Sequence, residues 1–150
     1  MEVTAVEDPA ARSELCQAVL ESLPEWFEIE EKVLDYIREV ADLPTFAVGC
    51  DGFLSLKQHT PAAAEIYVMG VRPESQGQGA GTALVEAAER FLLDRGVEFL
   101  QVKTLGPSQP DAHYARTRRF YESHGFRPLE ETTAFWGEAN PCLIMVKSLR

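Results

Sequence analysis

Four stretches of the chain place apolar residues at helical spacing. The first begins at Asp8-Pro9, where a side chain that caps helices is followed by proline, and it breaks after Leu23. The third and fourth end at Gly96 and Gly125, because glycine commonly follows a helix C-terminus. Helices are therefore predicted over residues 8–23, 29–43, 80–95 and 112–124.

Shorter apolar runs between turn residues predict seven strands, over residues 2–6, 45–48, 53–58, 65–71, 97–104, 126–135 and 142–148. The turn Gly49-Cys50-Asp51-Gly52 joins two of them as a hairpin. The order of elements is β-α-α-β-β-β-α-β-α-β-β, which predicts a mixed sheet with helices on its faces, an α/β or α+β fold. No linker-like stretch interrupts residues 1–150, so a single domain is expected.

Composition narrows the function classes. The 150 residues carry 14 basic and 24 acidic side chains, a net charge of −10, and an acidic surface repels the phosphates of nucleic acid. No run approaches the roughly 20 apolar residues that cross a bilayer. The N-terminus shows no secretory signal, so no membrane partner and a cytoplasmic location are expected. The three cysteines and three histidines form no ligand pair, so no metal is expected.

The stretch from Val68 to Leu84 carries the candidate chemistry, because a strand runs into three glycines and a helix follows them. A helix N-terminus presents N–H groups without intrahelical partners and a partial positive charge. Glycine lets a ligand approach the backbone closely. The combination predicts a phosphate or pyrophosphate site made by Gln76, Gly77, Gln78, Gly79, Ala80, Gly81 and Thr82.

Two common phosphate-binding motifs do not fit this turn. A Walker loop requires lysine before its Ser or Thr, whereas Gly81 precedes Thr82. A Rossmann fingerprint requires GxGxxG in the first βαβ unit, whereas Gly77, Gly79 and Gly81 give GxGxG in mid-chain. Glu98 does lie about where a ribose-binding acid would stand. A nucleotide-binding module is therefore the less favoured interpretation.

Two motifs resemble the GNAT family of N-acetyltransferases. The family signature Q/R-x-x-G-x-G/A is matched by Gln76-Gly77-Gln78-Gly79-Ala80-Gly81, after a strand that ends in Val71-Arg72-Pro73 as is common in the family. The second feature is a helix that ends in aromatic-Tyr-Glu-x-x-Gly-Phe, and it is matched by Phe120-Tyr121-Glu122-Ser123-His124-Gly125-Phe126. The resemblance covers residues 45–150.

This resemblance implies a fold and a co-substrate. The fold would be a mostly antiparallel twisted sheet with about four helices and a V-shaped split between the fourth and fifth strands. Acetyl-CoA would bind in that split, with its pantetheine arm along the backbone of Met69 and Val71 and its pyrophosphate on the N–H groups of residues 76–82. The family often has asparagine seven residues before the motif tyrosine. Tyr114 stands there in this chain, and we expect it to replace that contact or to line the channel.

Acetyl transfer to an amine needs a proton donor and a proton acceptor. Tyr121 is the candidate acid, because a phenol with a reference pKa of about 10 can exchange a proton with a thiol. Glu65 is the candidate base, because strand alternation places it on one face with Tyr67 and Met69. His59, on the preceding loop, and a water molecule are the alternative bases.

Aromatic side chains outside the helical stripes predict an acceptor pocket. Trp26, Phe27 and Trp136 lie in or beside breaks between elements, and Tyr67 faces the same side of its strand as Glu65. Lys103, at a strand end, is expected to be exposed. The acceptor is an amine that the sequence does not identify: small amines, antibiotics, amino acids and protein N-termini all stay open.

Direct transfer in a ternary complex is expected, because no cysteine stands in a motif for a covalent acetyl-enzyme. A non-catalytic acyl-CoA-binding or sensor module on the same fold is the alternative function. A homodimer is the default expectation for the oligomeric state, because two-fold dimers are the commonest oligomers.

Overall fold

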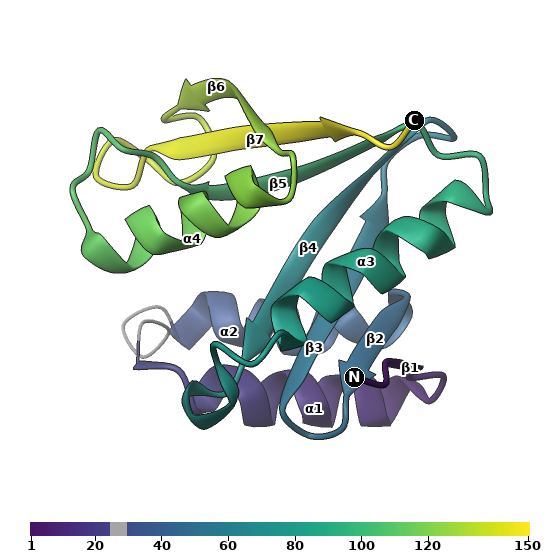
Figure 1. The fold of residues 1–150 in the computed structure, drawn as a ribbon. Coiled ribbons are helices and arrows are strands. Elements are labelled where there is room, and N and C mark those ends of the chain that lie inside the picture. Colours follow the sequence, from purple (N-terminus) through teal and green to yellow (C-terminus); the bar gives the residue numbers. More distant parts are fainter. Residues whose placement is uncertain (25–29) are drawn as a thin grey trace. The chain divides into compact units, whose positions relative to one another are not determined.

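The computed structural model describes residues 1–24 and 30–150 of the chain (Figure 1). Its elements in chain order are β1 (Thr4–Ala5), α1 (Pro9–Glu21), α2 (Glu30–Glu39), η2 (Val40–Asp42), β2 (Thr45–Val48), β3 (Gly52–Gln58), β4 (Ala63–Val71), η3 (Pro73–Ser75), α3 (Ala80–Leu93), β5 (Phe99–Leu105), α4 (Ala112–Ser123), β6 (Arg127–Thr132) and β7 (Cys142–Ser148). The strands are hydrogen-bonded in the order β1-β2-β3-β4-β5-β7-β6. The predicted mixed α/β fold is confirmed.

Two compact units make up the described residues. The first comprises Met1–Lys57 and Ile66–Asp94, and the second comprises Gln58–Glu65 and Arg95–Arg150. Strand β4 contributes its first residues to the second unit and the rest to the first unit. In the first unit, β2 pairs antiparallel with β1 and with β3, so that Phe46 faces Ala5 on one side and Leu54 on the other.

Helix α1 begins where the sequence predicts. The Asp8 carboxylate accepts the N–H of Ala11 at 2.9 Å, and proline occupies the first turn, where no N–H is needed. The buried face of α1 is made by Cys16, Val19 and Leu20. Leu23, just after the helix, is also buried, and the half-buried Leu15 packs against the same cluster.

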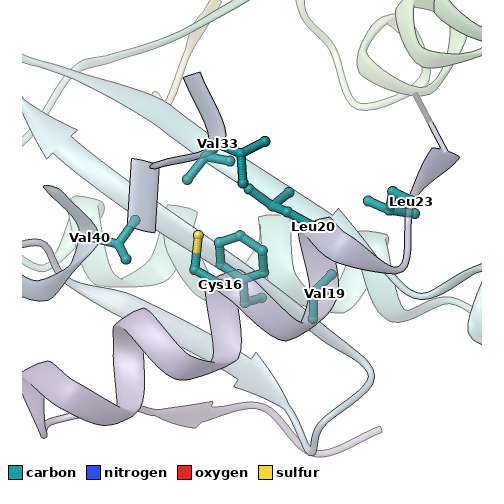
Figure 2. Close-up of a cluster of buried hydrophobic side chains, with 8 residues drawn as sticks. Cys16, Val19, Leu20, Leu23, Val33 and Val40 are labelled. Atoms are coloured by element: carbon teal, nitrogen blue, oxygen red, sulfur yellow. The ribbon is translucent and has the colours of Figure 1, made fainter. Parts of the chain in front are cut away.

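The core of the first unit is a cluster around α1 (Figure 2). Figure 2 shows side chains of α1 gathered with Val33 of α2 and Val40 of η2, and Phe53 and Val68 of the strands belong to the same cluster. Gly70 on β4 permits this packing. A Cβ at Gly70 would lie 3.1 Å from Cγ1 of Val19 and 3.2 Å from Cδ1 of Leu23, so a larger residue would force α1 away from the strand.

The second unit is built on a long antiparallel pair. Strand β5 pairs with β7 along its whole length, from Phe99 opposite Ser148 to Leu105 opposite Cys142. Strand β6 pairs with the other side of β7, with an irregularity between Pro128 and Glu130. Leu100, Phe126 and Met145 are fully buried, so this unit has an apolar core of its own.

Several predicted segments differ from the structure in their bounds, and among the strands the one over residues 126–135 is shortened most. The strand predicted over residues 126–135 is β6 alone, because the N–H of Phe126 is bonded to the carbonyl of Tyr121 and the carbonyl of Thr133 accepts the N–H of Gly137 in a turn. The second helix was predicted to include Ile29, which lies outside the described residues, as do Trp26 and Phe27.

Leu20→Ala is expected to lower the free energy of unfolding by about 2–5 kcal/mol, because it removes a fully buried side chain from the α1 cluster. Leu34→Ala is the matched control. Leu34 is 58% exposed on α2, so its loss should change stability by no more than about 0.5 kcal/mol. Urea titration of the two variants measures the difference. Equal losses would show that Leu20 is not in the core.

Burial also raises the pKa of the Cys16 thiol to about 12, from an ordinary value of 9.0. Above that ordinary value the unfolded chain loses a proton that the folded chain keeps. The free energy of unfolding should therefore fall as the pH rises from about 9 to about 12. In urea titrations at successive pH values, Cys16→Ala should show a smaller decrease of the free energy of unfolding over this pH range. Cys50→Ala, which removes an exposed thiol, should show the same decrease as the parent chain.

Candidate active site

The glycine-rich turn joins β4 to α3 in the first unit. After η3 the backbone takes positive φ at Gly77 (78°) and Gly79 (92°), a region that residues with a Cβ rarely adopt. A Cβ built at either glycine would meet no heavy atom within 4 Å. The turn therefore has open space beside a backbone that only glycine forms easily, as expected for a bound ligand close to the main chain.

The N-terminus of α3 lacks the side-chain cap that α1 and α4 have. Asp8 accepts the N–H of Ala11 at α1 and Asp111 accepts the N–H of Tyr114 at α4, whereas Gly79 precedes α3 without a side-chain cap. The first intrahelical acceptor is the carbonyl of Gly79, which takes the N–H of Ala83. The start of α3, with its backbone N–H groups and the positive end of its helix dipole, therefore favours binding of an anion.

Side chains hold this turn on the strand that precedes it. The Gln76 amide donates from Nε2 to the carbonyl of Val71 at 2.9 Å. Arg72 donates its N–H to the carbonyl of Asp51 and its Nε to the carbonyl of Cys50, at 2.8 and 2.7 Å. The Gln76 side chain is therefore occupied in fixing the turn, and the backbone N–H of Gln76 donates to the carbonyl of Pro73 at 3.3 Å.

Strand β4 carries the residues expected beside the acetyl group. Met69 and Val71 are half-buried, as are Gly81 and Thr82 of the following helix. Tyr67 packs edge-on against Tyr36 of α2, with ring centroids 5.1 Å apart, and the ammonium of Lys57 lies 5.2 Å from its ring centroid. Tyr67, Met69 and Val71 are half-buried and alternate with the buried Ile66, Val68 and Gly70, as strand alternation predicts. Tyr67 also packs against the cluster that contains its neighbour Val68.

Glu65 lies in a cluster of three ionisable side chains in the second unit. Its Oε1 is 2.7 Å from Nε2 of His59, and the ammonium of Lys103 is 3.3 Å from Oε1 and 3.4 Å from Oε2. The Glu65 side chain is 6% exposed, Lys103 is 23% exposed and His59 is 36% exposed. The structure thus brings the two base candidates, Glu65 and His59, into contact. Lys103, which the sequence predicted as an exposed strand-end lysine, is instead paired with Glu65.

Tyr121 is buried in α4 of the second unit. Its ring stands edge-on to Phe120 and to Phe126, with centroids 5.5 and 5.6 Å away. Burial, and secondarily the charge that the nearby Tyr114 phenol would carry, raise the pKa of Tyr121 well above its usual value. At neutral pH the Tyr121 phenol therefore keeps its proton and is available as a hydrogen-bond donor.

The loops that follow β5 and β6 are held at several points in the second unit. The hydroxyl of Ser108 donates to the Glu131 carboxylate, and Nη1 of Arg118 donates to the carbonyl of Leu105 at 2.6 Å. Trp136 is half-buried, and the ring of Phe135 is exposed with the Lys103 ammonium 4.8 Å from its centroid. Phe135 is an aromatic neighbour of the Glu65 cluster that sequence reasoning missed.

Two kinds of site are absent from residues 1–24 and 30–150. No group of three or more His, Cys, Asp or Glu side chains there could hold a metal ion. The helices of this described part are too short or too polar to cross a bilayer.

Comparison with known proteins identifies one family. The acetyltransferase (GNAT) domain matches residues 36–128, more than half of the chain. A mycothiol acetyltransferase of Beutenbergia cavernae is 40% identical over 74 residues, which cover 49% of this chain and 23% of that protein. The chain therefore matches only about a quarter of the length of this curated relative.

Solved structures share the fold along the whole chain. A GNAT-family protein from Desulfovibrio desulfuricans superposes with a TM-score of 0.82 at 22% identity, over 99% of this chain and 100% of that one. An aminoglycoside 6'-N-acetyltransferase complexed with coenzyme A superposes with a TM-score of 0.75 at 17% identity, over 100% and 98%.

Proposed function

The chain belongs to the GNAT family of acetyltransferases, and on that premise we propose that it transfers an acetyl group from acetyl-CoA to a primary amine of its acceptor. The observation that carries the proposal is the uncapped N-terminus of α3 behind two glycines with positive φ. The amine attacks directly in a ternary complex.

The pyrophosphate of acetyl-CoA binds to backbone N–H groups between Gln76 and Thr82. With a net charge of −10, the protein as a whole repels a polyanion, so the attraction must be local. Fixed N–H groups at a helix N-terminus provide such an attraction, and hydrogen bonds to a charged acceptor are about twice as strong as neutral ones. The pantetheine arm follows the backbone of Met69 and Val71.

The reaction requires a neutral amine, although an alkyl amine with a reference pKa near 10.4 arrives protonated. The pair of Glu65 and His59 provides the base that removes this proton. The amine nitrogen then attacks the thioester carbon, and a backbone N–H between Met69 and Val71 stabilises the oxygen of the tetrahedral intermediate.

Tyr121 acts on the leaving sulfur. Its raised pKa makes complete transfer of its proton to a thiolate, whose reference pKa is about 8.5, uphill. A hydrogen bond from the phenol to the sulfur as negative charge develops is the role that fits this environment.

Calorimetric titration tests the co-substrate, with ATP and NAD as controls. Selective micromolar binding of acetyl-CoA is expected, and tight ATP binding without acetyl-CoA binding would overturn the proposal. Release of free thiol with a panel of amines then separates an enzyme from an acyl-CoA-binding module, because such a module binds acetyl-CoA and releases no CoA. The panel holds a diamine, an aminoglycoside, an α-amino acid and a peptide with a free N-terminus.

Gly79→Ala is expected to weaken acetyl-CoA binding by at least about tenfold, the equivalent of roughly one lost charge-assisted hydrogen bond. The new methyl group enters the open space beside the turn and strains a backbone with φ of 92°. Gly96→Ala is the matched control, because Gly96 also has positive φ (76°) and open space but lies beyond the other end of α3. Calorimetry should show unchanged binding in Gly96→Ala, and equal affinities in both variants would refute the pyrophosphate assignment.

Tyr121→Phe is expected to lower kcat by about 10²-fold, with little change in the dissociation constant of acetyl-CoA, because only the hydroxyl at the sulfur is lost. Thiol-release kinetics and calorimetry measure the two quantities. The ring contacts with Phe120 and Phe126 survive this change, so thermal stability should stay close to that of the parent chain. An unchanged kcat would show that the Tyr121 hydroxyl takes no part in the reaction and that the residue is purely structural.

A further inference from the structure

The two base candidates differ in how their polar atoms are engaged. Both carboxylate oxygens of Glu65 already face donors: Oε1 faces His59 and Lys103, and Oε2 faces Lys103. The Glu65 side chain is only 6% exposed, whereas the His59 side chain is 36% exposed. A substrate amine can therefore approach the imidazole more readily than the carboxylate.

The contact with Glu65 selects the tautomer of His59. An ionised carboxylate only accepts hydrogen bonds, so the ring nitrogen 2.7 Å from Oε1 must be the one that carries the proton. In a neutral imidazole with a proton on Nε2, the lone pair is on Nδ1. Nδ1 of His59 is thus the basic atom of the pair, and Glu65 holds the ring in the form that can accept a proton there.

The backbone around His59 is fixed as firmly as the ring. The N–H of His59 donates to the carbonyl of Ala63 at 3.0 Å, which closes the turn between β3 and β4. The carbonyl of Ala62 accepts the N–H groups of Glu98 and Phe99 at 2.8 and 2.9 Å, which ties the same turn to the start of β5. A base held in this way needs no rearrangement before it acts.

From this geometry we infer that His59 is the general base and that Glu65 is a positioning residue for it, an assignment that rests on the proposed acetyl transfer. Glu65 of β4 contacts both His59 and Lys103 of β5, and the Lys103 ammonium balances the carboxylate before His59 accepts a proton from the amine. The acceptor ammonium gives one proton to Nδ1 of His59, which passes it to water. The nitrogen forms its bond to the carbonyl carbon, the C–S bond breaks with its electron pair on sulfur, and the second amine proton ends on the departing thiol.

The kinetic test compares His59→Ala, Glu65→Gln and the double variant in thiol-release assays. His59→Ala should lower kcat by about 10²-fold or more, and added imidazole should restore part of the loss. Glu65→Gln should lower kcat less, and the double variant should be no slower than His59→Ala, because Glu65 acts through the ring. His124→Gln, at the end of α4, is the control and should keep the parent rate.

The same variants show which assignment fails. If the parent chain releases no thiol with any amine, the proposed function falls. If the parent chain releases thiol and His59→Ala has the same kcat, or if Glu65→Gln has the lower kcat of the two single variants, the assignment of His59 is wrong while the proposed function stands.

Nitrogen-15 NMR of the imidazole tests the inference without an acceptor. The proton should reside on Nε2 in the parent chain and be shared between the two nitrogens in Glu65→Gln, and a proton on Nδ1 in the parent chain would overturn it.

Discussion

The start of α3 is the constraint on which the candidate site depends. A helix that begins after a left-handed glycine has no side chain at its N-cap, so no capping side chain covers the positive end of the helix dipole. Arg72 and Gln76 hold the turn against the end of β4 and the β2–β3 hairpin. The turn is therefore held in place by side chains that do not cap α3.

The second constraint is the burial of Glu65. A carboxylate on a side chain that is only 6% exposed would be costly without partners, and His59 and Lys103 supply them. The contacts of Glu65 therefore connect three segments of the second unit: the turn that carries His59, the start of β4, and β5 at Lys103. Lys103 also lies over the ring of Phe135, which links the cluster to the loop between β6 and β7.

Much of the fold could be predicted because local signals agree with one another. Asp8-Pro9 begins α1, the stripe from Ala80 to Leu92 forms α3, and strands β2 and β7 have the predicted bounds. These positions depend on capping, periodicity and turn chemistry, which act over a few residues. The packing of Tyr36 and Tyr67 against one cluster with α1 was not predictable, since it depends on how α2 packs there.

The sequence by itself determined the glycine-rich turn and the tyrosine of α4, because both are contiguous motifs whose spacing carries their meaning. It also placed Glu65 and His59 near one another in the chain, but not their contact. Only the tertiary structure decided that Glu65 is buried, that it bonds Nε2 of His59, and that Lys103, thirty-eight residues away, completes the cluster. The reason is physical: burial and ion pairing arise from strands brought together by folding, and no local spacing records which side chains then meet.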